Sequence, residues 1–141
     1  MSLQRAMGIG ATGLAAQRSR MELVSSNLAN ARTTRTPEGG PYRRQQPVFA
    51  AQPLHAGPAD PLGRALRSVR VVGIVQDPAP PLLRFEPGHP DANADGMVAY
   101  PNVDPVKEMV DMLSATRSYE AGVTLVRSVR EMMQGALQII A

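Results

Sequence analysis

The chain has 141 residues, enough for one ordinary domain, with 15 basic and 12 acidic residues and a formal charge of +3. It contains no cysteine, which excludes disulfides, thiolate catalysis and thiolate metal sites, and its only histidines are His55 and His89. We therefore expect a protein that is not an enzyme and that uses no metal ion or cofactor. No apolar run approaches the roughly 20 residues that a membrane span needs, and the N-terminus lacks the apolar region of a cleaved signal peptide.

The distribution of proline divides the chain into three segments. All 13 prolines lie between Pro37 and Pro105. Because proline costs about 3 kcal/mol inside a helix, the proline-free ends predict two long helices around an irregular insert. The expected fold class is α+β. Its parts are an N-terminal helical segment 1–36, a small proline-rich antiparallel β insert 37–104 and a C-terminal helix 105–141.

The N-terminal segment carries a heptad spacing of apolar residues. Its members are Met7, Leu14, Met21 and Leu28, with Val24 three residues after Met21. Gly8, Gly10 and Gly13 each cost about 1 kcal/mol relative to alanine, so the first turns are poor helix on their own. We expect this helix to need a partner.

The same glycines match the dinucleotide-binding pattern G-x-G-x-x-G in residues 8–13. That pattern works only after a strand and with an acid about 20 residues later. The preceding residues have no strand character, and Thr33 and Thr34 stand where the acid would be. The small residues therefore indicate either close helix packing or a loosely ordered start.

Short extended segments are expected in the insert. They are 42–49, 68–75, 82–85 and 97–100, each bounded by turn-forming residues. We expect one small antiparallel β unit with long loops, of which 50–64 is the most mobile. With so few aromatic residues it cannot form a deep core.

Two features of the insert superficially suggest chemistry. Residues 91–96 resemble the start of a calcium-binding loop, but Asn102 stands where the bidentate glutamate is required. Turn formation explains these Asp, Asn and Gly residues without a metal. His55 and His89 lie in proline- and glycine-rich stretches, and we interpret both as turn residues.

The C-terminal helix is the clearest expected element. Asp104 supplies an N-cap residue before Pro105, and Glu108 lies where the helix dipole favours an acid. Apolar residues then recur every seven positions at Met112, Tyr119, Val126, Met133 and Ile140. A second row three residues later includes Ala115, Gly122 and Val129. This stripe predicts a packed helix or a coiled coil.

Two apolar stripes must cover each other or another chain. If they pair, a thin helical stalk carries a small β head and still exposes apolar flanks, including Leu23, Met109, Leu113, Leu125 and Met132. Exposed contiguous apolar surface marks an interface, and an interface that does not close into a ring builds a helical filament. The plain alternative is a helical hairpin with an inserted loop.

Several segments resemble a known family. Residues 13–18 (GLAAQR) and 26–31 (SNLANA) are similar to the N-terminal signature of the flagellar rod and hook proteins. Further segments resemble the members of that family that build the proximal rod; these are 33–45, 71–75, 87–96, 100–106, 108–112 and 117–121.

The resemblance implies a structural subunit of the bacterial flagellar basal body. Members are not enzymes, and they reach the periplasmic rod through the flagellar type III export apparatus without a cleaved signal peptide. Their terminal helices form the inner coiled-coil layer of a hollow rod that transmits torque, and these helices order on assembly. The implied partners are copies of the chain, proximal rod proteins B and F, distal rod protein G, the MS-ring adaptor at the rod base and the export apparatus.

The expected assembly interface follows from the stripes and from the resemblance. It comprises Met7, Leu14, Met21, Val24, Asn27, Leu28, Asn30, Arg43, Arg44, Met112, Tyr119, Val126, Val129, Met133 and Ile140. The family's loops, 33–45 and 87–105 in this chain, would set contacts between neighbours.

One function from another class stays open. A small basic nucleic-acid-binding module could use Arg32, Arg35, Arg43 and Arg44 on a flexible arm. The bases are scattered, however, and no aromatic residues are interleaved to stack on bases, so we expect no nucleic-acid partner. A third hypothesis, an N-terminal helix lying on a membrane surface, needs aromatic anchors that 1–36 lacks.

Overall fold

The computed structural model describes residues 3–54 and 65–140, with side chains to residue 138. Its elements are α1 (Leu3–Ala29), β1 (Gln45–Pro53), β2 (Arg67–Gln76), β3 (Leu82–Phe85), β4 (Met97–Tyr100) and α3 (Pro105–Ile140). The expected α+β class, with two long terminal helices around a small β insert, is confirmed.

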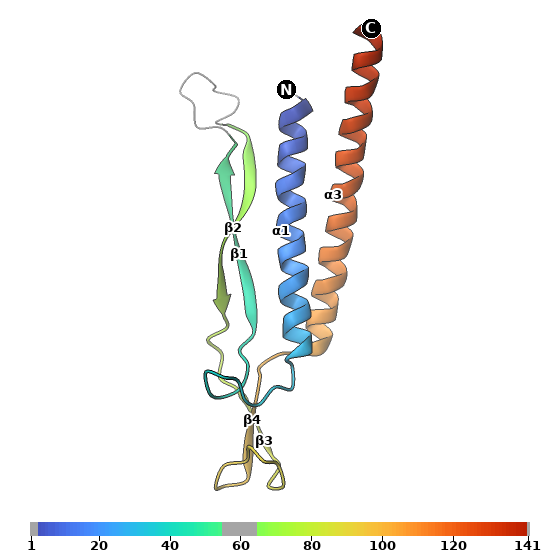
Figure 1. Ribbon diagram of the computed structural model, residues 1–141. Helices are drawn as coiled ribbons and strands as arrows, with labels where there is room; N and C mark the ends of the chain where they lie inside the picture. Colours follow the sequence, from blue (N-terminus) through green and yellow to red (C-terminus); the bar gives the residue numbers. More distant parts are fainter. Residues whose placement is uncertain (1–2, 55–64, 141) are drawn as a thin grey trace.

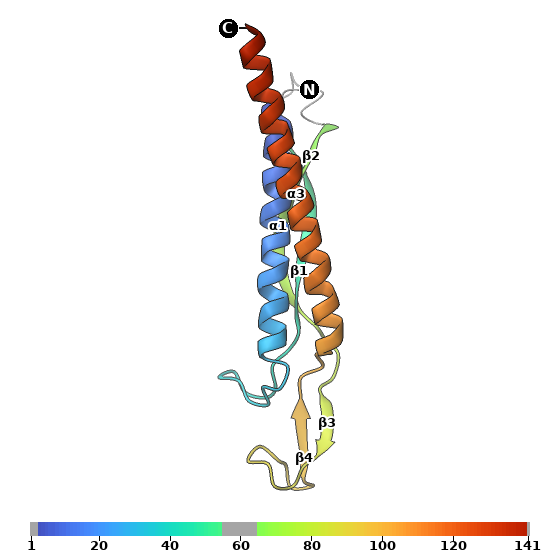
Figure 2. The ribbon, with the colours of Figure 1, turned by 90° about the vertical axis from the view of Figure 1, so that its right-hand side faces the viewer.

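The elements form an elongated molecule. Figure 1 shows α1 and α3 side by side and antiparallel, with the β1–β2 hairpin along the other side of α1 and the β3–β4 hairpin beyond the helix ends. Figure 2, the same molecule turned by 90°, shows β3 and β4 well below both helices. Helix α1 is therefore the central element, because it contacts α3 and both strands of the first hairpin.

Two expectations for the insert are wrong. It forms two separate antiparallel hairpins rather than one unit, and the larger hairpin lies along α1 instead of at its end. One hydrogen bond joins β2 to α1, in which the Val69 N–H donates to the Thr12 hydroxyl at 3.3 Å. Residues 50–53 continue β1 and are not part of a loop, while residues 55–64, including His55, lie outside the described part of the chain.

Close contact between the helices explains two glycines. A Cβ atom added to Gly10 would lie 2.9 Å from Val126, and one added to Gly122 would lie 2.8 Å from Leu14. Gly8 and Gly10 are both helical, and at Gly10 the close packing against α3 offsets the intrinsic cost of glycine. For Gly10 the first of the two alternatives left open by the sequence, close helix packing, is correct.

Gly10 and Gly13 offer a matched test of this packing. Gly13→Ala should stabilise α1 by up to about 1 kcal/mol, since a new Cβ meets nothing within 4 Å and alanine is the better helix former. Gly10→Ala should lose that gain or reverse it, because the stiff Val126 side chain blocks the methyl group. Hydrogen exchange of α1 peptides in the assembled state measures both. Equal protection in the two variants would contradict the close helix contact.

The start of α3 agrees with the sequence. The Asp104 carboxylate accepts hydrogen bonds from the backbone N–H groups of Val106 at 2.9 Å and Lys107 at 3.4 Å. This is the expected N-cap before Pro105.

The β3–β4 hairpin is held by polar contacts around Tyr100. Its hydroxyl donates to Glu86 at 2.8 Å, and this hydrogen bond, with the negative charge of Glu86, raises the pKa of Tyr100. The turn before β4 is built by Asn93, whose Oδ1 accepts from the N–H groups of Asp95 and Met97. Gly96 has a φ of +73°, which favours glycine. The stretch that resembles a calcium loop is thus a tight turn.

The buried core is small. The buried apolar residues in the described part of the chain are Ala16, Val24, Val98, Val103, Ala115 and Val129. The accessible surface is 9559 Å², whereas a compact monomer of 15.1 kDa would expose about 7,100 Å². The chain therefore exposes about a third more surface than a self-contained globule of its mass.

Candidate functional site

A buried polar cluster joins α1, β1 and α3 where the two helices meet the insert. Asn27, near the end of α1, is its centre and is 1% exposed. Its Nδ2 donates to the backbone oxygen of Gln45 at 2.9 Å and to Glu108 Oε2 at 3.0 Å. Its Oδ1 accepts from the Gln45 N–H and the Tyr42 hydroxyl, both at 2.9 Å. The amide thus pairs with the start of β1 as a neighbouring strand would.

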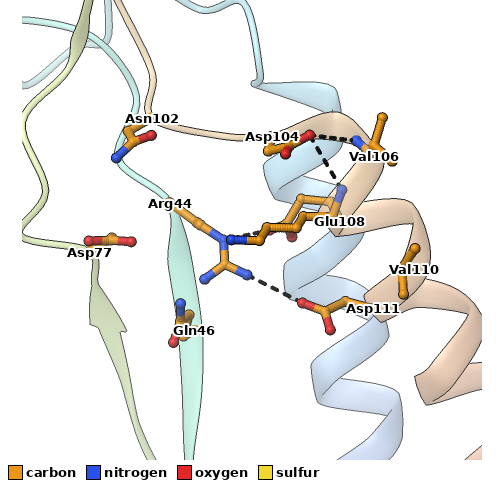
Figure 3. Close-up of a pocket in the computed structure, with 10 residues that line it drawn as sticks. Arg44, Gln46, Asp77, Asn102, Asp104, Val106, Glu108, Val110 and Asp111 are labelled. Carbon is orange, nitrogen blue, oxygen red and sulfur yellow. Dashed lines mark hydrogen bonds and ion pairs between the residues drawn. The ribbon is translucent and has the colours of Figure 1, made fainter.

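Glu108 brings α3 into the same cluster. Its side chain is fully buried, and its Oε1 accepts from Arg44 Nε at 2.5 Å. Arg44 also reaches Asp111 at 3.4 Å, and Arg20 of α1 reaches the other oxygen of Asp111 at 3.1 Å. Figure 3 shows Arg44 between Glu108 and Asp111, with Asp77 on the far side of the cavity that these residues line. The buried charges are therefore paired, as burial requires.

Asn30 shapes the exit from α1. Its Nδ2 donates to the backbone oxygen of Ser26 at 2.9 Å, and its Oδ1 accepts from the Thr33 hydroxyl at 3.1 Å. Ser26 in turn lies 3.3 Å from the Tyr42 hydroxyl. Serine and both asparagines of the stretch 26–31 thus position the chain between α1 and β1.

The structure places the expected interface residues as follows. Val24, Asn27 and Val129 are buried, and Arg43 is exposed. The half-buried residues are Met7, Leu14, Met21, Leu28, Asn30, Arg44, Met112, Tyr119, Val126 and Met133. The side chain of Ile140 lies outside the described side chains. Several stripe residues meet within the chain, as at Leu14 with Gly122 and at Met21 with Thr116, so their contacts with other subunits stay a prediction.

Sequence reasoning missed four members of the cluster: Arg20, Tyr42, Glu108 and Asp111. Glu108 carried a usable signal. It stands seven residues before Ala115, in the row that continues through Gly122 and Val129, so it is an acid at an apolar heptad position. An acid at such a position needs a buried cation, and Arg44 is that cation.

Arg44 also bears on the nucleic-acid hypothesis. Its side chain is 18% exposed, and its guanidinium pairs with two carboxylates within the chain; Arg35 lies 3.8 Å from Asp91. The arm of four arginines is thus partly neutralised within the molecule, which weighs against a phosphate-binding surface.

The described residues offer no other chemical centre. Within 3–54 and 65–138 there is no group of three or more His, Asp or Glu side chains that could hold a metal ion. Neither described helix is apolar enough along its length to cross a membrane. The open cavity beside Arg44 has a volume of about 560 Å³ and is lined by charged and apolar side chains.

Comparison with known proteins identifies the family. The family described as "Flagella basal body rod protein" matches residues 7–35, and "Flagellar basal body rod FlgEFG protein C-terminal" matches residues 94–139. The flagellar basal-body rod protein FlgC of Borreliella burgdorferi is 43% identical, with 99% of each chain covered. The proteins of that name from Salmonella typhimurium and Bacillus subtilis are each 41% identical, over 99% of this chain and 98% and 99% of theirs. These matches cover nearly the whole chain, including both helices and the insert between them. The chain therefore belongs to the FlgC family of flagellar basal-body rod proteins.

Proposed function

We propose that this chain polymerises through α1 and α3 into the hollow proximal rod and transmits torque there, without enzymatic activity. The observation that carries the proposal is the large accessible surface of the chain together with its small buried core. About 2,500 Å² of surface beyond that of a compact monomer is available for burial. Stable assemblies bury about 2,000 Å² or more per interface, so an exposed surface of this extent is sufficient to form one.

The exposed apolar residues of α3 support the same proposal. Val106, Met109, Val110 and Leu113, named here the α3 outer stripe, are 55–69% exposed. Their spacing of three, one and three residues gathers them on one side of the helix. Apolar surface of this kind marks an interaction site, and a contact that does not close on itself builds a filament.

The helices also suit a mechanical role. The ion pairs of Arg20 and Arg44 with α3 hold the helices together at one end, and the helices also approach closely at Gly10 and Gly122. Closely packed contacts resist deformation, so in an assembly torque would pass through many parallel helix contacts.

The implied neighbours and location belong to this proposal. The chain would contact its own copies, proximal rod proteins B and F, distal rod protein G and the MS-ring adaptor. It would reach the periplasmic space through the type III export apparatus. A small core suits such a route, because helices with few buried residues complete their order on assembly.

Limited trypsin digestion tests the proposed assembly. Arg18 and Arg127 are exposed cleavage sites in the two helices. In isolated basal bodies both sites should resist cleavage, and in the free chain they should be cut first while a middle fragment survives. Equal cleavage of both sites in basal bodies and in the free chain would contradict burial of α1 and α3 in the assembly.

Arg43 provides a separate test of contacts between subunits. Arg43→Glu should change the stability of the chain by less than about 0.5 kcal/mol, since the side chain is exposed, but should reduce the swimming halo of a complemented deletion strain. Arg44→Glu is unsuitable alone, because it breaks the pair with Glu108. Full swimming with Arg43→Glu would remove Arg43 from the interface.

A further inference from the structure

The two ends of α3 carry different side-chain charges. Toward the C-terminal end of α3, Arg127 and Arg130 are exposed, and the exposed acid Glu131 lies beside them in the sequence. At the other end lies the open cavity beside Arg44, which is lined by the carboxylates of Asp77, Asp104, Glu108 and Asp111 and by two cations, Arg44 and Lys107. The cavity is therefore net acidic.

Half of the acidity of this cavity is not neutralised within the chain. Arg44 pairs with Glu108 and Asp111, whereas Asp77 and Asp104 form no ion pair with any described residue. Each carboxylate accepts a local backbone hydrogen bond through one oxygen. Asp77 accepts from the N–H of Ala79, and Asp104 accepts from the N–H of Val106. Figure 3 shows these two carboxylates on opposite sides of Arg44. The cavity thus suits a cationic side chain from outside.

An apolar rim borders the same cavity. Val106 and Val110 of the α3 outer stripe line it and are 69% and 61% exposed. An occupant of this place would therefore combine apolar side chains with one or two cations.

The far end of α3 has that combination. Since Gly10 packs against Val126 in an antiparallel pair, Leu3 lies level with Met133, and α3 continues past the described start of α1 (Figure 1). Arg127, Arg130, Gln134 and Leu137 follow one another at spacings of three, four and three, which places them on one helical face. Leu137 is 66% exposed and both arginines are exposed.

We propose that this end of α3 docks on the acidic cavity of a second copy of the chain. Arg127 and Arg130 then face Asp77 and Asp104, and Leu137 covers Val106 and Val110. The two surfaces lie at opposite ends of one helix, so every copy keeps one free surface of each kind. Such a contact is heterologous and repeats along an assembly without a change in chemistry. The inference rests on the proposed function, because it names the contact through which the copies associate.

Disulfide cross-linking tests the contact directly, since the chain has no cysteine of its own. The variant carries Val110→Cys and Leu137→Cys. Within one chain these positions are about 40 Å apart along α3, too far for a disulfide, so any bond joins two copies. The matched control carries Arg117→Cys and Leu137→Cys, with Arg117 exposed and outside the cavity. After oxidation of isolated basal bodies, we expect the first pair to give about tenfold more cross-linked product than the control. This product comprises dimers and higher oligomers of the chain.

A second measurement uses the unmodified chain. Lys107, its only lysine, lies at the cavity, and a carbodiimide should join it to Glu131 of another copy. If the cysteine variant fails to incorporate into basal bodies, the presence or absence of the Lys107–Glu131 cross-link tests the contact instead. Basal bodies that contain the chain but yield neither product, or that join Val110→Cys to a different rod protein, would overturn the inference and leave the proposed function intact. Absence of the unmodified chain from basal bodies would instead contradict the proposed function.

Discussion

Glu108→Ala is expected to abolish swimming and to remove the chain from isolated basal bodies. The glutamate is fully buried and is the nearest anion to Arg44, whose side chain is 18% exposed. Removing one partner of a buried ion pair leaves an uncompensated charge and costs about 3–5 kcal/mol. The substitution also removes one of the two acceptors of the Asn27 amide N–H groups. A small core has little stability to absorb such a loss.

The double variant Arg44→Met with Glu108→Met provides the decisive comparison. Apolar residues of similar length often replace a buried ion pair at little cost, so this variant should recover part of the incorporation. Glu38→Ala is the matched control, since Glu38 is exposed and forms no ion pair with a described residue. Immunoblots confirm that all chains are produced. If Glu108→Ala swims like the control, the cluster does not hold the helices together.

Asn27→Asp should be nearly as damaging, although only one group of atoms changes. The new carboxylate cannot donate to Gln45 or Glu108, and it places a second negative charge about 3 Å from the Glu108 carboxylate. An unsatisfied buried group costs about 1–3 kcal/mol, and the cost is larger where the lost hydrogen bond becomes a contact between two carboxylates. We expect loss of incorporation and of swimming, measured as for Glu108→Ala.

Asn93→Asp is the matched control for this change. Asn93 is exposed, and only its Oδ1 takes part, accepting from two backbone N–H groups, a role that a carboxylate fills equally well. Adding Glu108→Gln to Asn27→Asp exchanges donor and acceptor and should restore part of the function. Equal swimming of Asn27→Asp and Asn93→Asp would show that the Asn27 donors are unimportant.

The helices could be predicted from the sequence because their signals are local. The distribution of proline, the Asp104–Pro105 start and the heptad rows each depend on residues a few positions apart. The strands 82–85 and 97–100 also agree with the structure, because turn-forming residues bound them closely. The predicted strand 42–49 has no turn-forming residue directly after it, and β1 continues beyond the predicted end to Pro53.

The cluster could not be predicted, because its members are far apart in the chain. Asn27 and Glu108 are separated by 81 residues, and Arg44 and Glu108 by 64. From the sequence we interpreted Glu108 as an acid favoured by the helix dipole, which is a solvent-exposed role. Only the packing of β1 against the end of α1 brings Gln45 and Arg44 to the same place. The position of the first hairpin along α1 is likewise a tertiary contact without a local signal.

The most direct test of the central claim is imaging of basal bodies from a strain in which the gene for this chain is deleted. If the chain is a structural subunit of the rod, the mutant should assemble basal bodies without a complete rod and should not swim. Complementation with the unmodified chain should restore both, and the chain should then be present in the purified rods. Complete rods and normal swimming in the deletion strain would contradict the assignment.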